Sequence, residues 1–446
     1  MRPKTNQEKS FTQILKTSCH IDCLLVPVFV TVLLQLTSIS IRYHSAFRGK
    51  MSTNNHNHQT FDVDKFRQPL ETLKGLPNVA YSSSAFAEFE RDHVLAKTWF
   101  CVANVAQLLD ESWAQPVDIL DLPLLVVRDK DTAIRVFHNV CSHRGMKLVE
   151  QSGAVKRLIT CRYHGWCYST SGELKATPHI NGEGVHSDEK FNQTLHGLKE
   201  IRSHIFAGMI FINIDGQAPE FESFIKPITD HWNEFDFGDY THGGTDSFWE
   251  IELEGNWKFA QENHVDGYHL PFVHPGLNSY SPLRDHRPLM IEGSASGQIS
   301  LGQHHAGAIG ETRLPYNPKL SQPFQAGRAE FLSIFPNIMI GVHADHIWMV
   351  HLIPISETRT FERMDLLYFS EGATSSEYHD IRSKNRDRML EIFEEDRDMV
   401  EGMQRGRKSP AFDGGALSPG MDQPAHCFNR IVAKAVVEAL ELNTDL

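Results

Sequence analysis

Residues 141–168 read CSHRGMKLVEQSGAVKRLITCRYHGWCY and contain two cysteine–histidine pairs, Cys141 with His143 and Cys161 with His164. A gap of 17 residues separates the two pairs. Thiolates and imidazoles bind soft and borderline metal ions, and four of them on two loops predict a closed metal site. Zinc accepts the same donor set. Common zinc fingers, however, group the two cysteines in one pair and the two histidines in the other, so the mixed pairs favour a different metal centre.

The residues that follow each pair carry a resemblance to a known family. Arg144-Gly145 follows the first histidine and Gly165-Trp166 follows the second, and in this the stretch resembles the Rieske loops of ring-hydroxylating oxygenases. The resemblance implies a [2Fe–2S] cluster in which the two cysteines hold one iron and the two histidines hold the other. Neutral imidazoles in place of two thiolates make such a cluster less negative and raise its reduction potential.

Other residues near these loops indicate which branch of the family the chain resembles. Respiratory-chain Rieske proteins carry a further disulfide between the loops, and this chain has Met146 and Tyr163 where those cysteines would lie. The oxygenase or ferredoxin branch is therefore favoured. Cys167 is expected to be a packed thiol beside the cluster. The seven cysteines are an odd number spread over 446 residues, which indicates a reducing compartment.

A second motif lies about a hundred residues after the first, where a simple Rieske ferredoxin would already have ended. Residues 255–275 read GNWKFAQENHVDGYHLPFVHP, with Asp266, His269 and His274 spaced D-x2-H-x4-H. Asp266 and His269 are expected on one face of a helix, and the two prolines are expected to break it so that His274 folds back. Two histidines with one carboxylate form a face that leaves iron(II) positions open for O₂.

The resemblance extends to this stretch. The segments that recur in oxygenase catalytic domains are Asn256-Trp257-Lys258, Glu262-Asn263 and Asp266-Gly267-Tyr268-His269. The resemblance implies that His269 and His274 ligate a mononuclear Fe(II). It also implies that Asp266 forms a bridge to the cluster without being an iron ligand, and that Asp266 and Asn263 take part in catalysis. The residues alone leave an alternative, in which these are exposed polar residues of an amphipathic helix.

The third iron ligand is expected near the C-terminus. Residues 393–398 read FEEDRD, and the pattern EDxxxxExxQ that ends at Gln404 resembles the segment with the carboxylate ligand of the family. Asp396 is the predicted ligand, and Glu395 and Asp398 remain alternatives.

Periodicity and turn residues predict an α+β chain. An all-β Rieske domain is expected over 97–215, followed by a catalytic domain with an antiparallel sheet and helices over 216–446, to which 51–96 adds the N-terminal part. The predicted strands are 99–105, 124–127, 133–138, 158–160, 209–214, 248–253, 347–353 and 364–369. The predicted helices are 256–268, 378–404 and 428–440.

Residues 1–50 differ in composition from the rest of the chain. An apolar run over 23–36 is shorter and more polar than the roughly 20 apolar residues that span a bilayer. No acidic residue lies between Cys23 and Phe61, as is typical of organellar targeting segments. The stretch is either a targeting segment for a plastid or mitochondrion, or an over-extended start before Met51 in a cytoplasmic protein. Neither interpretation predicts a membrane anchor.

The charge of the chain indicates which kinds of partner it can bind. The formal net charge is −13, which argues against a nucleic-acid binder because phosphate neutralisation needs a basic face. Five basic residues nevertheless gather around the Cys/His loops, and they predict docking of an acidic redox partner. These are Arg144, Lys147, Lys156, Arg157 and Arg162.

The resemblance also implies an activity. Electrons from NAD(P)H would arrive through a reductase or ferredoxin, pass from the cluster to the iron of a homotrimer, and serve to hydroxylate a small organic substrate with O₂. The substrate is either an aromatic acid, as in benzoate-type dioxygenases, or a quaternary ammonium compound, as in choline- and carnitine-type monooxygenases. A cation would need an aromatic cage. Candidates for that cage are Phe272, Tyr280, Tyr316, Phe331 and Trp348. The rival hypothesis is a non-catalytic electron carrier or metal-binding scaffold without a second iron.

Overall fold

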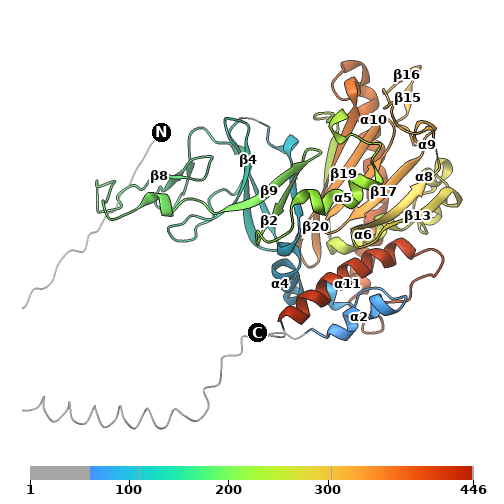
Figure 1. The fold of residues 1–446 in the computed structure, drawn as a ribbon, viewed down its shortest axis with the longest axis horizontal. Coiled ribbons are helices and arrows are strands. Elements are labelled where there is room, and N and C mark those ends of the chain that lie inside the picture. The colour runs from blue at the N-terminus through green and yellow to red at the C-terminus, as the bar shows by residue number, and fades with distance from the viewer. Residues whose placement is uncertain (1–60, 110, 303, 444–446) are drawn as a thin grey trace, which may run out of the picture. The chain divides into compact units, whose positions relative to one another are not determined.

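The computed structural model describes residues 61–109, 111–302 and 304–443, and Figure 1 shows their fold. This part of the chain combines antiparallel sheets with helices, which is the α+β class that the sequence predicts. The segment predicted over 1–50 lies outside the described residues. Within the described ranges, no helix is long and apolar enough to cross a membrane.

The first sheet has seven strands in the order β1-β10-β9-β4-β3-β2-β5. Its strands are β1 (Phe100–Asn104), β2 (Trp113–Ile119), β3 (Leu122–Arg128), β4 (Ile134–His138), β5 (Gly153–Ala154), β9 (Glu200–Phe206) and β10 (Met209–Asn213). A small three-stranded sheet contains β6 (Ile159–Thr160), β7 (Cys167–Tyr168) and β8 (Leu174–Ala176). The first Cys/His pair lies between β4 and β5, and the second lies between β6 and β7. Both pairs are therefore on loops that leave a β framework.

The second sheet has eight strands, in the order β11-β20-β19-β18-β17-β14-β13 with β12 paired to β20. Its strands are β11 (Tyr240–His242), β12 (Phe248–Leu253), β13 (His286–Ile291), β14 (Ala295–Ser300), β17 (Ala329–Ile334), β18 (Ile338–Val342), β19 (His346–Ser356) and β20 (Arg359–Phe369). A hairpin of β15 (Ala308–Ile309) and β16 (Thr312–Arg313) lies outside it. The helices are α2 (Val63–Glu71), α3 (Val79–Ser82), α4 (Ser84–His93), α5 (Phe221–His231), α6 (Trp257–Val265), α7 (Leu270–Val273), α8 (Pro275–Tyr280), α9 (Gln322–Gln325), α10 (His379–Gly406) and α11 (Gln423–Asn443).

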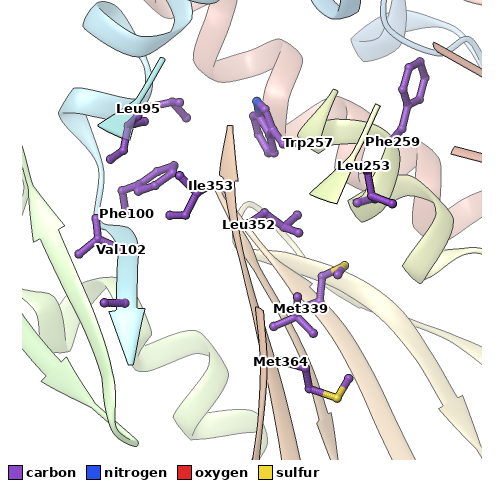
Figure 2. Packing of buried hydrophobic residues seen from close by; sticks show 14 of the residues in the cluster. Leu95, Phe100, Val102, Leu253, Trp257, Phe259, Met339, Leu352, Ile353 and Met364 are labelled. Atoms are coloured by element: carbon purple, nitrogen blue, oxygen red, sulfur yellow. The ribbon is translucent and has the colours of Figure 1, made fainter. Parts of the chain in front are cut away.

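Both faces of the second sheet are buried. Along β19, alternate side chains point to opposite faces. Trp348, Val350 and Leu352 belong to a core cluster that includes residues of α6, α10 and α11, whereas Ile347 and Met349 belong to a cluster with α5. Figure 2 shows the first cluster, in which side chains of β1, α6 and the second sheet meet. The two sheets therefore share a core, and this fixes the position of α6 and α10 on the second sheet.

Helix α6 ends earlier than predicted. The prediction of a helix to Tyr268 is wrong, because α6 ends at Val265 and Asp266 is extended. The Asp266 carboxylate accepts a hydrogen bond from the backbone N–H of Tyr268 at 2.6 Å, and such local bonds compete with the helical hydrogen bonds. The two prolines then begin short helices and do not end one, since Pro271 lies in the first turn of α7 and Pro275 is the first residue of α8.

The N-terminal helices pack against helices that cover the second sheet. Helix α2 packs against α11, the last helix of the chain. A fully buried ion pair joins Glu90 of α4 to Lys258 of α6 at 2.7 Å. The segment from Phe61 to residue 96 thus packs against helices that follow the first sheet in sequence, and the start predicted for it at Met51 lies outside the described residues.

Candidate functional site

The two Cys/His loops repeat one backbone arrangement. The N–H of Cys141 donates to the carbonyl of Met146 at 2.8 Å, and the N–H of Cys161 donates to that of Trp166 at 2.8 Å. In each loop a glycine at φ near +70° closes the turn, namely Gly145 at +71° and Gly165 at +72°. This left-handed conformation favours glycine over every other residue. The glycines that carry the family resemblance thus have a conformational role.

The four donor side chains converge in two pairs. The rings of His143 and His164 are 4.6 Å apart between centroids, and both residues are exposed. Cys141 and Cys161 are each only 2% exposed, and both are free thiols. Burial, and then the neighbouring Cys161, raises the pKa of the Cys141 thiol. Two buried thiols become thiolates only beside a strong positive charge, and this donor set fits a cluster with one Cys-ligated and one His-ligated iron.

Further side chains support this site. The Tyr168 hydroxyl lies 3.2 Å from Cys141 Sγ and accepts a hydrogen bond from the Ser142 N–H at 3.1 Å. The Trp166 ring stacks on His143 with centroids 4.7 Å apart. The third cysteine of this region, Cys167, donates a hydrogen bond from Sγ to the carbonyl of Gly165 at 3.0 Å. That contact agrees with its expected role as a packed thiol.

Two of the five basic residues around the Cys/His loops form ion pairs, so three unpaired cations remain there among the described residues. Lys147 pairs with Asp118 at 2.6 Å, and Arg162 pairs with Glu150 at 3.1 Å. The other three cations are exposed and have no ion pair within the described ranges. They are Arg144, Lys156 and Arg157.

The second predicted site also forms. His269, His274 and Asp396 each offer one atom within 4.8 Å of the others, and no other cluster of three or more such donors occurs in the described part of the chain. The Asp396 Oδ1 is 2.9 Å from Nε2 of His274 and 3.6 Å from Nε2 of His269. Two imidazoles and one carboxylate are the donor set that suits iron(II) with open positions.

Two other carboxylates orient the imidazoles. Nδ1 of His269 donates to Asp266 at 3.1 Å, and Nδ1 of His274 donates to Glu395 at 2.6 Å. A histidine that donates through Nδ1 keeps the lone pair of Nε2 for a metal. Burial lowers the pKa of His274, but Asp396 and Glu395 outweigh it, and the net pKa is raised. The site therefore attracts a cation.

The three candidates for the carboxylate ligand lie in different positions relative to the two histidines. Asp396 reaches both histidines, Glu395 contacts the opposite nitrogen of His274, and Asp398 is exposed. Asn263 lines the cavity beside the histidines, and its backbone carbonyl accepts from the N–H of Asp266 at 3.1 Å.

A cavity adjoins this donor set, and sequence reasoning identified only part of its wall. Tyr280, Phe331 and Trp348 line it, as expected for an aromatic cage. Phe272 and Tyr316 do not line it and are 79% and 50% exposed. Further lining residues that were not predicted include His304, His343, His346, Glu362, Arg388 and Phe393.

Several of these cavity residues are titratable and buried. Burial, and then Asp396, raises the pKa of Glu362 to about 8, and burial lowers the pKa of His304 to about 3. Glu362 lies among other charged residues of β20, so no local sequence signal marks this part of the wall.

Comparison with known proteins identifies the two parts of the chain. Residues 98–192 match the family model of the Rieske [2Fe-2S] domain, and residues 239–438 match that of the ring-hydroxylating alpha subunit catalytic domain. The match to the catalytic domain argues against a simple electron carrier.

Relatives match over most of the chain. The carnitine monooxygenase oxygenase subunit of Acinetobacter baumannii is 28% identical over 344 residues, which are 76% of this chain and 86% of the relative. The chloroplastic choline monooxygenase of Arabidopsis thaliana is 26% identical over 371 residues, covering 81% and 82%. A solved quaternary ammonium Rieske monooxygenase with L-carnitine shares the fold, with a TM-score of 0.65 and 22% identity over 85% of this chain and 99% of that one. The two family matches and the two donor sets show that the chain belongs to the Rieske non-haem iron oxygenases, as the hydroxylase component with a [2Fe–2S] cluster and a mononuclear iron.

Proposed function

We propose that the chain hydroxylates a quaternary ammonium compound in the cavity beside His269, His274 and Asp396, which hold the mononuclear iron. The observation that carries this proposal is the convergence of these three side chains at the wall of an aromatic-lined cavity. These three residues would hold iron(II), which would supply O₂ activation when bound. The cavity residues orient the substrate and exclude water.

The cluster ligands are also proposed from the positions of their side chains. We propose that Cys141 and Cys161 hold one iron and that His143 and His164 hold the other. The support is that the thiols are buried together while the imidazoles meet at the surface. Exposed imidazoles place the His-ligated iron where an electron donor or acceptor can approach. A reductase or ferredoxin that draws on NAD(P)H is the proposed donor, and Arg144, with the other unpaired basic residues, would meet it.

Asp266 is the proposed bridge between the two centres. It holds the Nδ1 of His269, and no hydrogen bond joins it to His143 or His164 within the described part of this chain. A bridge to a cluster histidine must therefore come from another copy of the chain. This supports a homotrimer in which the cluster of one subunit serves the iron of the next.

The aromatic wall supports a cationic substrate. Phe331 and Trp348 lie 5.9 Å apart between ring centroids, and Trp348 lies 6.0 Å from Phe393. Rings arranged around one space attract a quaternary ammonium through cation–π interactions. Relatives that match over most of the chain include a carnitine and a choline monooxygenase. These observations favour the quaternary ammonium class over aromatic acids.

The test is a substrate panel with purified holoenzyme, reductase and NADH. We expect O₂ uptake matched by product with choline or carnitine and none with benzoate. The uncharged isostere of choline, 3,3-dimethylbutan-1-ol, separates charge from shape, and a cation–π site should prefer choline by about tenfold in kcat/KM. Trp348→Leu should remove that preference, whereas Tyr316→Leu, outside the cavity, should leave it. Turnover of benzoate without turnover of either quaternary amine would contradict the proposed substrate class.

A further inference from the structure

One arginine of the cavity wall is not used by the chemistry described above. Arg388 of α10 is half-buried and lines the cavity. Its Nη2 donates to Oδ1 of Asn385 at 2.7 Å and to the carbonyl of His305 at 3.5 Å. Its Nε is buried and has no hydrogen-bond partner in the described ranges. A guanidinium has five N–H donors, so most of its capacity remains free.

The absence of an acidic partner distinguishes Arg388 from the other arginines of α10. Each of the others has a carboxylate within 4.0 Å, and none of them except Arg397 lines the cavity. These are Arg382, Arg386, Arg397 and Arg405. Arg388 has no ion pair with any described residue. Burial of an unpaired charge is unfavourable, so a half-buried guanidinium at a cavity wall is suited to an anion that arrives with the ligand.

The helix fixes how far this charge lies from the iron ligands. Arg388, Ile392 and Asp396 all line the cavity from α10, one helical turn apart. Eight residues of helix separate Arg388 from Asp396, or about 12 Å along the axis. The rings of Trp348 and Phe393 line the same cavity. An anion bound at Arg388 and a carbon positioned beside the iron ligands would therefore belong to one molecule with several bonds between them.

Two polar side chains near the cavity wall are already engaged by neighbouring groups. Asp345 already contacts Nδ1 of His346 at 2.7 Å and accepts from the N–H of Ala306 at 2.8 Å. His343 donates through Nδ1 to the carbonyl of His304 at 2.9 Å, and its buried Nε2 has no partner among the described residues. A neutral imidazole of this kind can accept a hydrogen bond from a bound hydroxyl or water, and it leaves the anion to Arg388.

We propose that Arg388 binds a carboxylate of the substrate, so that the enzyme favours a small organic acid, whose reacting carbon lies several bonds from its carboxylate, over a similar molecule without one. This inference rests on the proposed function of the cavity and adds a specificity-determining residue to it. Guanidinium and carboxylate match as a fork, with two parallel N–H···O bonds. The rest of the acid could be a quaternary ammonium chain or an aromatic ring, and the two are separated by experiment.

The test is calorimetric binding to holoenzyme without reductant, so that no turnover occurs. Each probe acid is paired with an uncharged analogue: γ-butyrobetaine with its methyl ester, and 3-phenylpropanoate with its amide. For at least one pair, wild type should bind the acid about tenfold or more tightly than the uncharged analogue. Arg388→Gln should abolish this preference, and Arg388→Lys should restore part of it because it keeps the charge without the fork. Arg386→Gln, two residues away and outside the cavity wall, should leave it unchanged.

Three results would overturn the proposal: no acid bound by wild type, equal binding of acid and analogue, or a preference that survives in a folded Arg388→Gln enzyme. Iron content and the cluster spectrum establish folding for each variant, and the Lys variant supplies an independent comparison if the Gln variant does not fold. Adding reductase, NADH and O₂ then tests the proposed function separately. If 3-phenylpropanoate binds in the Arg388-dependent way and γ-butyrobetaine neither binds nor reacts, the quaternary ammonium substrate fails while the carboxylate site stands.

Discussion

Glu395 and Asp396 contact opposite nitrogens of one imidazole ring. Oε2 of Glu395 is 2.6 Å from Nδ1 of His274, and Oδ1 of Asp396 is 2.9 Å from Nε2. Two neighbouring carboxylates on α10 thus fix both the orientation and the tautomer of a single histidine. They are expected to have different roles in spite of their identical charge.

The two carboxylates should differ in their effect on iron. Asp396→Ala removes the proposed carboxylate ligand, so mononuclear iron and turnover should be lost while the cluster spectrum remains. Glu395→Gln removes only the support of His274 and should weaken iron binding by about 10- to 100-fold. Asp398→Asn, on the exposed side of the helix, serves as the control and should bind iron like wild type. Metal analysis after dialysis against a weak chelator measures all three, and full iron in Asp396→Ala would assign the ligand to another residue.

The cluster should depend on the paired cysteines and not on their neighbour. Cys141→Ser should abolish the visible Rieske spectrum and leave the mononuclear site able to take up iron, because the two donor sets lie in separate parts of the sequence. Cys167→Ser should keep the spectrum, since that thiol bonds to the carbonyl of Gly165. Absorption spectra and iron content give the answer. Loss of all iron in Cys141→Ser would show that the two sites are not independent.

How much of the site was predictable depended on how local each signal is. Each Cys/His pair occupies one loop, and Asp266, His269 and His274 occupy one short segment, so their spacing could be read directly. The choice between Glu395, Asp396 and Asp398 could not be made in this way, because it depends on which of them contacts a histidine more than a hundred residues earlier. The cavity wall was out of reach for the same reason. Glu362 and Arg388, for example, come from different elements that meet only in the folded chain.

The secondary structure was also predicted only in part. Strand β12, in which apolar and acidic residues alternate, and strand β19, which has an apolar run, were predicted close to their observed bounds. Strand β2 was missed because Gln115, Pro116 and Asp118 interrupt its apolar pattern, and β9 was missed because its residues are mostly polar. Both are held by pairing with neighbouring strands, which the single sequence does not display. The end of α6 was misplaced because the bond from Asp266 to the N–H of Tyr268 competes with helix continuation.

Reduction by the redox partner should be sensitive to salt. Arg144, Lys156 and Arg157 are exposed without ion pairs in the described ranges, and steering by such charges weakens as ionic strength rises. The rate of cluster reduction should therefore fall with added salt. Arg144→Gln should lower the rate and flatten its salt dependence, whereas Arg162→Gln should do less because Glu150 already neutralises Arg162. Stopped-flow reduction at several salt concentrations provides the measurement, and a flat profile for wild type would count against the docking face.

Acid should destabilise the fold through buried histidines. Burial lowers the pKa of His351 to about 4, against 6.5 as its ordinary value. The unfolded chain therefore takes up a proton at a higher pH than the folded chain, so stability is fully present above pH 6.5 and falls as the pH drops toward 4. Between pH 7 and 5, His351→Leu should lose about 2 kcal/mol less unfolding free energy than wild type. Urea unfolding at both pH values measures this. The exposed His186→Gln should behave like wild type, and equal losses in the Leu variant would refute the assignment.

Asp266→Asn should uncouple the two metal centres without emptying either. The substitution keeps the size of the side chain but removes the charge that holds Nδ1 of His269 and, in the proposed trimer, a cluster histidine of the adjacent subunit, His164 by family analogy. Iron content should stay near that of wild type. If Asp266 were itself a ligand, mononuclear iron would be lost, and if it were a plain surface residue, neither iron nor electron transfer would change.

The rate of cluster oxidation in pre-reduced protein, mixed with substrate and O₂ in the absence of the partner, measures this coupling directly. In wild type the cluster should be oxidised in step with formation of hydroxylated product, because its electron is used at the iron beside His269, His274 and Asp396. In iron-loaded Asp266→Asn both should slow by about a hundredfold or more. Cluster oxidation without product in wild type, or oxidation at the wild-type rate in Asp266→Asn, would contradict the use of both centres in one reaction through Asp266.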